Sequence, residues 1–260
     1  MERPLILAHQ GGEKEWPSNT LHAFGEAYKL GVDVLDTDLH MTRDGVLVLI
    51  HDTTVDRTTD GTGAVAELDW AHLEKLDAAY RFTLDGKTFP WRGQGIRIAR
   101  LDETLDAFPH WRLQIEVKQA PPEIAKVLGD LLREKNAEDR VLLSCFDPVV
   151  TAALRRACPN VASSATPSEI RTMVIASWFH LEGLISPGYS CFQVPLKHSG
   201  LSLVTRRTVS ACHSRGVTVL PWTLDTDAEV ELCRTAGADG FNTNLPSKML
   251  RYKKDWRNGL

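Results

Sequence analysis

Short apolar runs alternate with amphipathic stretches along most of this chain, and that alternation constrains the fold more than any other feature. Residues 5–9 (LILAH) and 34–39 (VLDTDL) are predicted to be buried strands. Residues 19–30 instead carry apolar side chains at helical spacing and end at Gly31, a good helix stop. Strands that alternate with helices in this way are typical of parallel strands joined by crossover helices.

The number of such units favours a closed barrel. About eight fit into the 260 residues, which is close to the roughly 250 residues of one TIM barrel. We therefore predict the α/β class, with a TIM (β/α)8 barrel spanning residues 1–260 as a single domain. An open doubly wound sheet is the alternative, because periodicity alone does not show closure. The apolar runs are residues 5–9, 34–39, 46–50, 113–117, 141–144, 192–194, 217–220 and 240–241, and the main helical stretches are residues 19–30, 122–135, 147–157, 204–215 and 228–236.

Residues 53–99 interrupt the alternation. They contain DRTTDGTG and a second glycine-rich piece ending in FPWRGQG, without sustained periodicity. Long irregular segments of compact domains usually serve as lids or binding loops. We therefore predict a small insertion at about 53–99, after the second strand, over one mouth of the barrel.

Composition excludes several classes of protein. The net charge of −4 and the pI of about 6.1 argue against a nucleic-acid partner. The 5 cysteines include no CxxC pair, which argues against a disulfide framework and fits a reducing cytosol. The N-terminus lacks a signal-peptide pattern, and no apolar run reaches the ~18 residues of a membrane span. We expect a cytoplasmic protein without a transmembrane segment, and the sequence leaves a homo-oligomer open.

Charged and titratable side chains gather where the apolar runs end. His9 ends the first run, His51 follows residues 46–50, and Asp36 and Asp38 lie on the second predicted strand. Side chains at i and i+2 of a strand point to the same side, so these two carboxylates face one way. Buried carboxylates persist mainly where a partner offsets their charge.

Residues 113–117 carry a further carboxylate, Glu116, and Lys118 follows on the same side. Together with Asp36 and Asp38, Glu116 completes an all-oxygen ligand set, which suits Mg²⁺ or Ca²⁺ rather than zinc. All these residues lie at the carboxyl ends of predicted strands, where barrel enzymes carry their active sites.

The order of these motifs resembles the glycerophosphodiester phosphodiesterase family over almost the whole chain. The matching segments are AHQGG (8–12), PSNT (17–20), DTD (36–38), TRDGVLVLIHD (42–52), DRTTDGTG (56–63), IEVK (115–118), SCFDP (144–148), PWTLD (221–225) and GADGFNTNLP (237–246). The resemblance implies a metal-dependent hydrolase that converts a glycerophosphodiester into an alcohol and glycerol 3-phosphate.

The resemblance also implies roles for individual residues. His9 and His51 match the acid/base pair, and two histidines can serve both roles near neutral pH. The metal ligands of the family correspond to Asp36, Asp38 and Glu116, which would hold a divalent cation, Mg²⁺ or Ca²⁺. Contacts to the phosphate or the substrate are implied for Gln10, Asn19, Lys118 and Trp222.

Three positions depart from the family pattern. Gln10 stands where the family usually has Arg, Asp36 where it has Glu, and Ser18 where it has Glu. Because Gln is neutral and does not clamp a phosphate as a guanidinium does, we expect phosphate binding to depend more on Lys118 and the metal. A second cation nearby is the other expectation, with Arg43, Arg57 and Arg100 as candidates.

Structural interpretations compete with these functional ones. Asp36 and Asp38 could cap a helix or form salt bridges, Glu116 and Lys118 could form a simple ion pair, and Trp222 could belong to the core. Asn19 could merely cap the first helix. For the whole chain, the alternatives are a lysophospholipase D-type enzyme acting on lysophospholipids and a catalytically weak phosphodiester-binding protein. The apolar residues 173–185 are expected to be buried in the barrel wall; a lipid-binding rim beside the site is their second interpretation.

Overall fold

The computed structural model describes residues 4–119 and 123–256, and in that part of the chain eight parallel strands close into a barrel. These strands are β1 (Leu5–His9), β2 (Val34–Met41), β5 (Arg112–Val117), β6 (Val141–Ser144), β7 (Ala162–Ser163), β8 (Cys191–Phe192), β11 (Thr218–Val219) and β12 (Gly240–Thr243). Regular parallel ladders join β12, β1, β2, β5, β6 and β7 in that order, and a separate parallel ladder joins β8 to β11.

Backbone contacts outside the regular ladders close the two remaining gaps between strands. A parallel bridge between Ser164 and Cys191 connects the end of β7 to β8. The backbone N–H of Asn242 on β12 donates to the carbonyl oxygen of Pro221, just after β11, at 2.9 Å. The strands therefore form the closed TIM barrel, and the open doubly wound sheet is ruled out.

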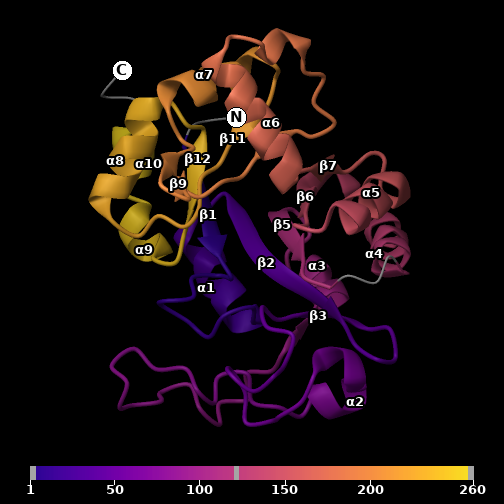
Figure 1. The fold of residues 1–260 in the computed structure, drawn as a ribbon. Coiled ribbons are helices and arrows are strands. Elements are labelled where there is room, and N and C mark those ends of the chain that lie inside the picture. Colours follow the sequence, from indigo (N-terminus) through magenta and orange to yellow (C-terminus); the bar gives the residue numbers. More distant parts are fainter. Residues whose placement is uncertain (1–3, 120–122, 257–260) are drawn as a thin grey trace.

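Helices surround this barrel (Figure 1), and each of the eight strands is followed by one in the described part of the chain. They are α1 (Leu21–Leu30), α3 (Leu101–Ala107), α4 (Glu123–Glu134), α5 (Pro148–Ala157), α6 (Pro167–Trp178), α7 (Arg206–Ser214), α8 (Asp227–Ala236) and α9 (Pro246–Met249). Shorter elements are α2 (Trp70–Leu73), α10 (Tyr252–Asp255), the 3-10 turns η1 (Val65–Glu67), η2 (Glu138–Arg140) and η3 (Glu182–Leu184), and the strands β3 (Leu47–Leu49), β4 (Ala99–Arg100), β9 (Lys197–His198) and β10 (Leu201–Ser202).

Local sequence explains where these helices begin and end. The Thr20 hydroxyl accepts a hydrogen bond from the N–H of Ala23 at 3.1 Å and caps α1, while Gly31 ends it with φ of 80°. Reciprocal capping boxes open α6 and α8, each pairing a threonine with the glutamate three residues on. The turns before these helices are therefore fixed by side chains, and the cavity-lining residues on them are held in place.

Two apolar runs differ from the predicted strand pattern. Residues 46–50 form β3, which pairs antiparallel with β2 and belongs to a hairpin rather than to the barrel. The fifth barrel strand, β7, was not predicted because its two residues are too few to show any period. The helix expected from residue 122 is α4, described from Glu123; Pro122 lies outside the described residues.

Residues 53–99 lie to one side of the barrel and hold η1 and α2 among turns (Figure 1). Their buried apolar side chains Val55, Val65 and Leu73 pack with Val48 of β3 into a small cluster. We propose that this segment is an insertion within a single domain, because its core is continuous with a strand that pairs with β2.

Candidate active site

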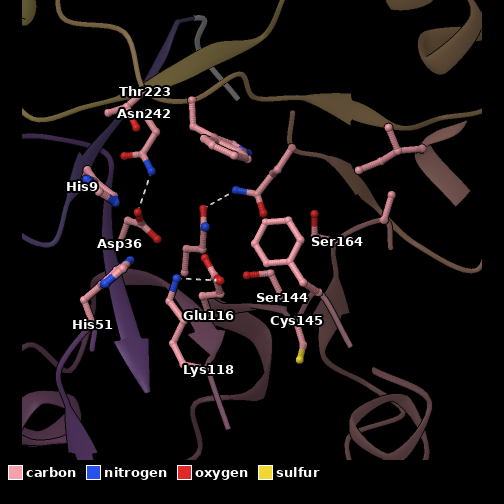
Figure 2. Close-up of a pocket in the computed structure, with 16 residues that line it drawn as sticks. His9, Asp36, His51, Glu116, Lys118, Ser144, Cys145, Ser164, Thr223 and Asn242 are labelled. Carbon is pink, nitrogen blue, oxygen red and sulfur yellow. Dashed lines mark hydrogen bonds and ion pairs between the residues drawn. The ribbon is translucent and has the colours of Figure 1, made fainter. Parts of the chain in front are cut away.

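A cavity of about 300 Å³ opens among the carboxyl ends of the barrel strands. Its lining comes from every part of the barrel sequence, and Figure 2 shows the residues as sticks. Its charged and titratable side chains, called the charged wall below, are His9, Asp36, His51, Glu116 and Lys118; the neutral wall consists of Gln114, Ser144, Ser164 and Gln193. In Figure 2, Ser144 and Ser164 lie across the cavity from His9, Asp36 and His51.

His9 ends β1 in a polar environment. Its Nδ1 lies 2.6 Å from Oδ1 of Asn244 and 3.5 Å from the Glu13 carboxylate. Burial lowers the pKa of His9, but the Glu13 contact and the nearby charge of Asp36 outweigh burial and raise the pKa to about 9. The imidazole is therefore largely protonated at neutral pH.

Asp36 faces the same cavity from β2, in register with His9. Asn242 donates to its Oδ2 at 2.5 Å, and the side chain is buried. Burial raises the pKa of Asp36 to about 7, with the charge of His9 acting in the opposite direction. A carboxylate with so little hydration is one that a bound cation would stabilise.

Lys118 joins the other two carboxylates. Its ammonium lies 2.7 Å from Glu116 and 3.1 Å from Asp38. Burial lowers the pKa of Lys118, but the two carboxylates outweigh it and the pKa is raised. Burial likewise raises the pKa of Glu116, which Lys118 opposes. Asp38 itself does not line the cavity; it is buried and also accepts a hydrogen bond from Asn19 at 2.9 Å.

His51 is held by a chain of charged groups. Its Nδ1 lies 2.8 Å from Oδ1 of Asp52, and Arg57 donates two hydrogen bonds to that carboxylate, at 2.5 and 3.0 Å. These Arg57 contacts, with that of His51, lower the pKa of Asp52 to about 2. The Arg57 guanidinium also lies 3.8 Å from Glu13, the carboxylate beside His9, so one charged network reaches both histidines.

The predicted metal ligands do not form a preassembled cluster. Among residues 4–119 and 123–256, no three His, Cys, Asp or Glu side chains are grouped as metal ligands are. Instead, Lys118 bridges Asp38 and Glu116, and Asn242 contacts Asp36. The donor set still fits a divalent cation chemically, since Asp36 and Glu116 share one cavity and burial raises the pKa of both.

Other predicted contacts fall in different places. Trp222 lines the cavity and packs edge-on against Phe146, with 6.3 Å between the ring centres. Gln10 is buried beside His9 and does not line the cavity; its Nε2 lies 3.5 Å from Nε2 of His9. Asn19 does not line it either, because its amide is occupied by Thr37 and Asp38. Their predicted substrate contacts remain predictions.

None of the three arginines expected as a second cation lines the cavity. Arg43 pairs with Asp69, and Arg100 pairs with Asp102. Arg57 pairs with Asp52. Lys118 is the one Lys or Arg that lines the cavity in the described chain.

No helix of the described residues has the length and apolar character to cross a membrane.

The apolar residues 173–185 are only partly buried. Met173 and Val174 face the core, whereas Trp178, Phe179 and Leu184 are 51%, 66% and 84% exposed. None of the described residues that line the cavity falls in 171–185. Helix α6 contributes one residue to the lining, Ile170. The exposed rim therefore does not belong to the cavity. The expected burial in the barrel wall holds only for part of the segment, because α6 packs by one face and Phe179 and Leu184 lie beyond its last residue, Trp178.

A closed (β/α)8 barrel with titratable side chains at the carboxyl ends of its strands defines an α/β-barrel enzyme. Residues 9–248 match the model of the glycerophosphoryl diester phosphodiesterase family. A glycerophosphodiester phosphodiesterase of Caldanaerobacter subterraneus subsp. tengcongensis is 30% identical over 255 residues, covering 95% of this chain and 97% of that protein. This chain therefore belongs to the glycerophosphoryl diester phosphodiesterase family and is a phosphoric diester hydrolase.

Solved structures agree on the fold. The glycerophosphoryl diester phosphodiesterase domain of a Mycobacterium tuberculosis protein superimposes with a TM-score of 0.86 at 21% identity, over 96% of this chain and 99% of that one. An Oleispira antarctica phosphodiesterase, solved in complex with the product sn-glycerol-3-phosphate, gives 0.77 at 23% identity, over 97% of both chains. Membership of this family sets aside the interpretation of the chain as a mere phosphodiester-binding protein.

Sequence reasoning missed most of the neutral wall. Gln114 could have been found, because it precedes Glu116 by two residues on β5 and must face the same side. Gln193 and Ser164 follow strands of only two residues, where no period exists to assign a face. Glu13 lies in a turn, and nothing in its sequence neighbourhood indicates contact with His9.

Proposed function

We propose that this protein hydrolyses glycerophosphodiesters to an alcohol and glycerol 3-phosphate, using His9 and His51 as the acid/base pair. The observation that carries the proposal is that two histidines, the buried carboxylate Asp36, the half-buried carboxylate Glu116 and a lysine line one cavity. That cavity lies at the carboxyl ends of the barrel strands, where barrel enzymes carry their active sites. Small diesters suit a cavity of about 300 Å³.

His9 is proposed as the general acid. Its pKa of about 9 keeps the imidazole protonated near neutral pH, so it can give a proton to the departing alkoxide oxygen. Glu13 and Asn244 both contact Nδ1, which leaves Nε2 as the nitrogen able to face the substrate.

His51 is proposed as the general base that removes a proton from the attacking oxygen. Asp52 contacts Nδ1 of His51, and Arg57 fixes Asp52 through two hydrogen bonds. A carboxylate in that position orients the ring and stabilises the imidazolium that forms when the base accepts a proton. Asp52 and Arg57 are thus positioning residues.

Negative charge accumulates on the phosphoryl oxygens during cleavage, and Lys118 is proposed to offset part of it. A divalent cation, Mg²⁺ or Ca²⁺, held by Asp36, Asp38 and Glu116 would supply further positive charge at the same place. Lys118 contacts two of these carboxylates, so its ammonium is held within the charged wall rather than in solvent.

The substrate assay separates the two enzymatic hypotheses. Purified protein is incubated with glycerophosphocholine and with lysophosphatidylcholine, in Mg²⁺, in Ca²⁺ and in chelator, and released choline is measured. We expect metal-dependent release from glycerophosphocholine. Preferential turnover of lysophosphatidylcholine would instead identify a lysophospholipase D-type enzyme, and no release from either would contradict the proposal.

A further inference from the structure

A second cavity, of about 160 Å³, is lined jointly by the insertion and by the turn that follows β1. Glu13 and Ser18 come from that turn, and Arg57, Thr58 and Arg81 come from the insertion. Among the described residues, none lines both this second cavity and the cavity at the carboxyl ends of the barrel strands. The second cavity is therefore a separate space, and two guanidinium groups border it.

Arg81 brings a positive charge that has no acidic partner. Its Nε donates to the carbonyl oxygen of Thr59 at 3.0 Å, and the N–H groups of both Nη atoms have no hydrogen-bond partner within residues 4–119 and 123–256. Arg92 of the same insertion also donates from Nε to a backbone carbonyl, but its guanidinium stacks on two rings, 4.2 Å from Tyr80 and 3.9 Å from Phe89. Arg81 lies 6.0 Å from the Tyr80 ring, so its donors remain available to a ligand.

Arg57 presents its charge to the same cavity from a fixed position. Two of its hydrogen bonds hold the Asp52 carboxylate, and its Nη1 lies 3.8 Å from Glu13, beyond hydrogen-bond distance. The Glu13 carboxylate also lies 3.5 Å from His9, so both acids already have cationic partners. Of the charged residues that line the second cavity, two are arginines and one is a glutamate, so positive charge is in excess there.

Two hydroxyl groups add neutral donors beside the arginines. The side chains of Ser18 and Thr58 have no hydrogen-bond partner among the residues that the structure describes. Position 18 is also one at which this chain departs from the family pattern, which has Glu. A glutamate there would bring a carboxylate next to the arginines, whereas serine leaves that space to a ligand.

We propose that the second cavity binds a small oxyanion, a phosphate or a carboxylate, which accepts hydrogen bonds from both arginines and both hydroxyls. A planar guanidinium matches the geometry of such oxygens, and charge-assisted hydrogen bonds are stronger than neutral ones. The anion is either free phosphate or an acidic group on the alcohol half of a diester. The second case rests on the phosphodiesterase function proposed above, and the experiment has one arm for each source.

The first arm measures binding without turnover. Equilibrium dialysis against ³²P-labelled inorganic phosphate, in excess chelator, gives the dissociation constant and the number of phosphate ions bound per chain. We expect Arg81→Gln to weaken one phosphate site at least about tenfold. Ser18→Glu should do the same, because it places a carboxylate in the second cavity. Arg92→Gln makes the same charge change at the stacked arginine and should bind phosphate as the wild type does.

The second arm measures KM for glycerophosphoserine and for glycerophosphoethanolamine, whose alcohols differ by one carboxylate. If the anion belongs to the substrate, Arg81→Gln should raise KM for glycerophosphoserine about tenfold and leave KM for glycerophosphoethanolamine unchanged. If the anion is free phosphate, added phosphate should lower kcat for glycerophosphoethanolamine, because it competes with Asp52 for the N–H groups of Arg57 and Asp52 holds His51. Arg81→Gln should then remove that inhibition.

The outcomes separate the anion site from the proposed function. A loss specific to Arg81→Gln in either arm supports the site, and the arm in which it occurs identifies the source of the anion. Phosphate binding and KM for glycerophosphoserine that both stay unchanged in Arg81→Gln would overturn the site, as would equal losses in Arg92→Gln. A protein that turns over neither diester but loses phosphate binding in Arg81→Gln would contradict the proposed function and leave the anion site standing.

Discussion

The two walls of the cavity are built from different kinds of strand. Most of the charged wall comes from β1, β2 and β5, which are five, eight and six residues long. Most of the neutral wall lies at the end of β6 or directly after β7 and β8, which have four, two and two residues. Long strands hold alternate side chains on a fixed face by their ladders. Three of the five residues of the charged wall are thus positioned by long regular strands, whereas Ser164 and Gln193 of the neutral wall lie just beyond strands of two residues.

The difference between the two walls matches the different tasks expected of their residues. Groups that transfer protons or offset charge must be placed accurately, and most of them lie on the half of the barrel that has the longer strands. Groups that recognise a neutral part of the substrate tolerate looser placement. If the comparison holds, changes in the charged wall act mainly on kcat, and changes in the neutral wall act mainly on KM and on substrate choice.

The largest expected effect comes from the charged wall itself. His9→Ala should lower kcat for glycerophosphocholine by about a thousandfold, because the leaving alkoxide loses its acid. Exposed His110→Ala is the matched control and should retain full activity. A His9→Ala enzyme that keeps more than about a tenth of wild-type kcat would contradict the comparison, since it would show that His9 of the charged wall is not needed for catalysis.

Asp52→Asn tests the orientation of His51. The neutral amide cannot stabilise the imidazolium, so we expect kcat to fall about tenfold to hundredfold with little change in KM. Arg57→Gln should produce a smaller loss in the same direction, because Asp52 remains. Arg43→Gln, which breaks an ion pair remote from the cavity, serves as the control. An effect on KM alone would contradict a positioning role.

Asn19→Ala tests what holds the charged wall together. Asn19 has φ of 57° and hydrogen bonds to Thr37 and Asp38, so its loss should lower the free energy of unfolding by about 2 kcal/mol, measured by urea denaturation. Asn136→Ala shares the left-handed backbone at an exposed turn and corrects for that contribution. Equal losses in the two variants would mean that the Asn19 side chain contributes nothing to stability.

Glu13→Gln is expected to have the mildest effect, a shift in the pH profile. Glu13 acts to raise the pKa of His9, so its removal lowers that pKa. His9 then loses its proton at lower pH, and the alkaline limb of kcat/KM should move to lower pH. Glu15→Gln, two residues away in the same turn, controls for the change in net charge. An unchanged alkaline limb would show that Glu13 does not govern His9.

The sequence predicted the charged wall because its residues carry strong signals. DTD and IEVK place charges at alternate positions of apolar runs, and charged side chains on buried strands are rare unless a partner or a functional site accounts for them. It predicted a barrel from the number of strand–helix units, but not β7, whose two residues have no period.

What the sequence could not predict depends on contacts between distant segments. The Glu13 contact to His9 and the Arg57 contact to Asp52 arise where turns meet. The Gln114–Gln193 pair joins residues 79 apart, and the Asp36–Asn242 pair joins residues 206 apart. Glutamine, serine and asparagine are also common in ordinary turns, so their side chains give little warning of a site.

The most direct test of the charged wall identifies the phosphorus-containing products of the reaction. Glycerophosphocholine is incubated with wild-type protein in Mg²⁺, in Ca²⁺ and in excess chelator, and ³¹P NMR identifies the products. We predict the appearance of glycerol 3-phosphate, fastest with one of the two cations, abolished by chelator and lost in His9→Ala. Phosphocholine as the product, or unchanged turnover in chelator, would contradict the account.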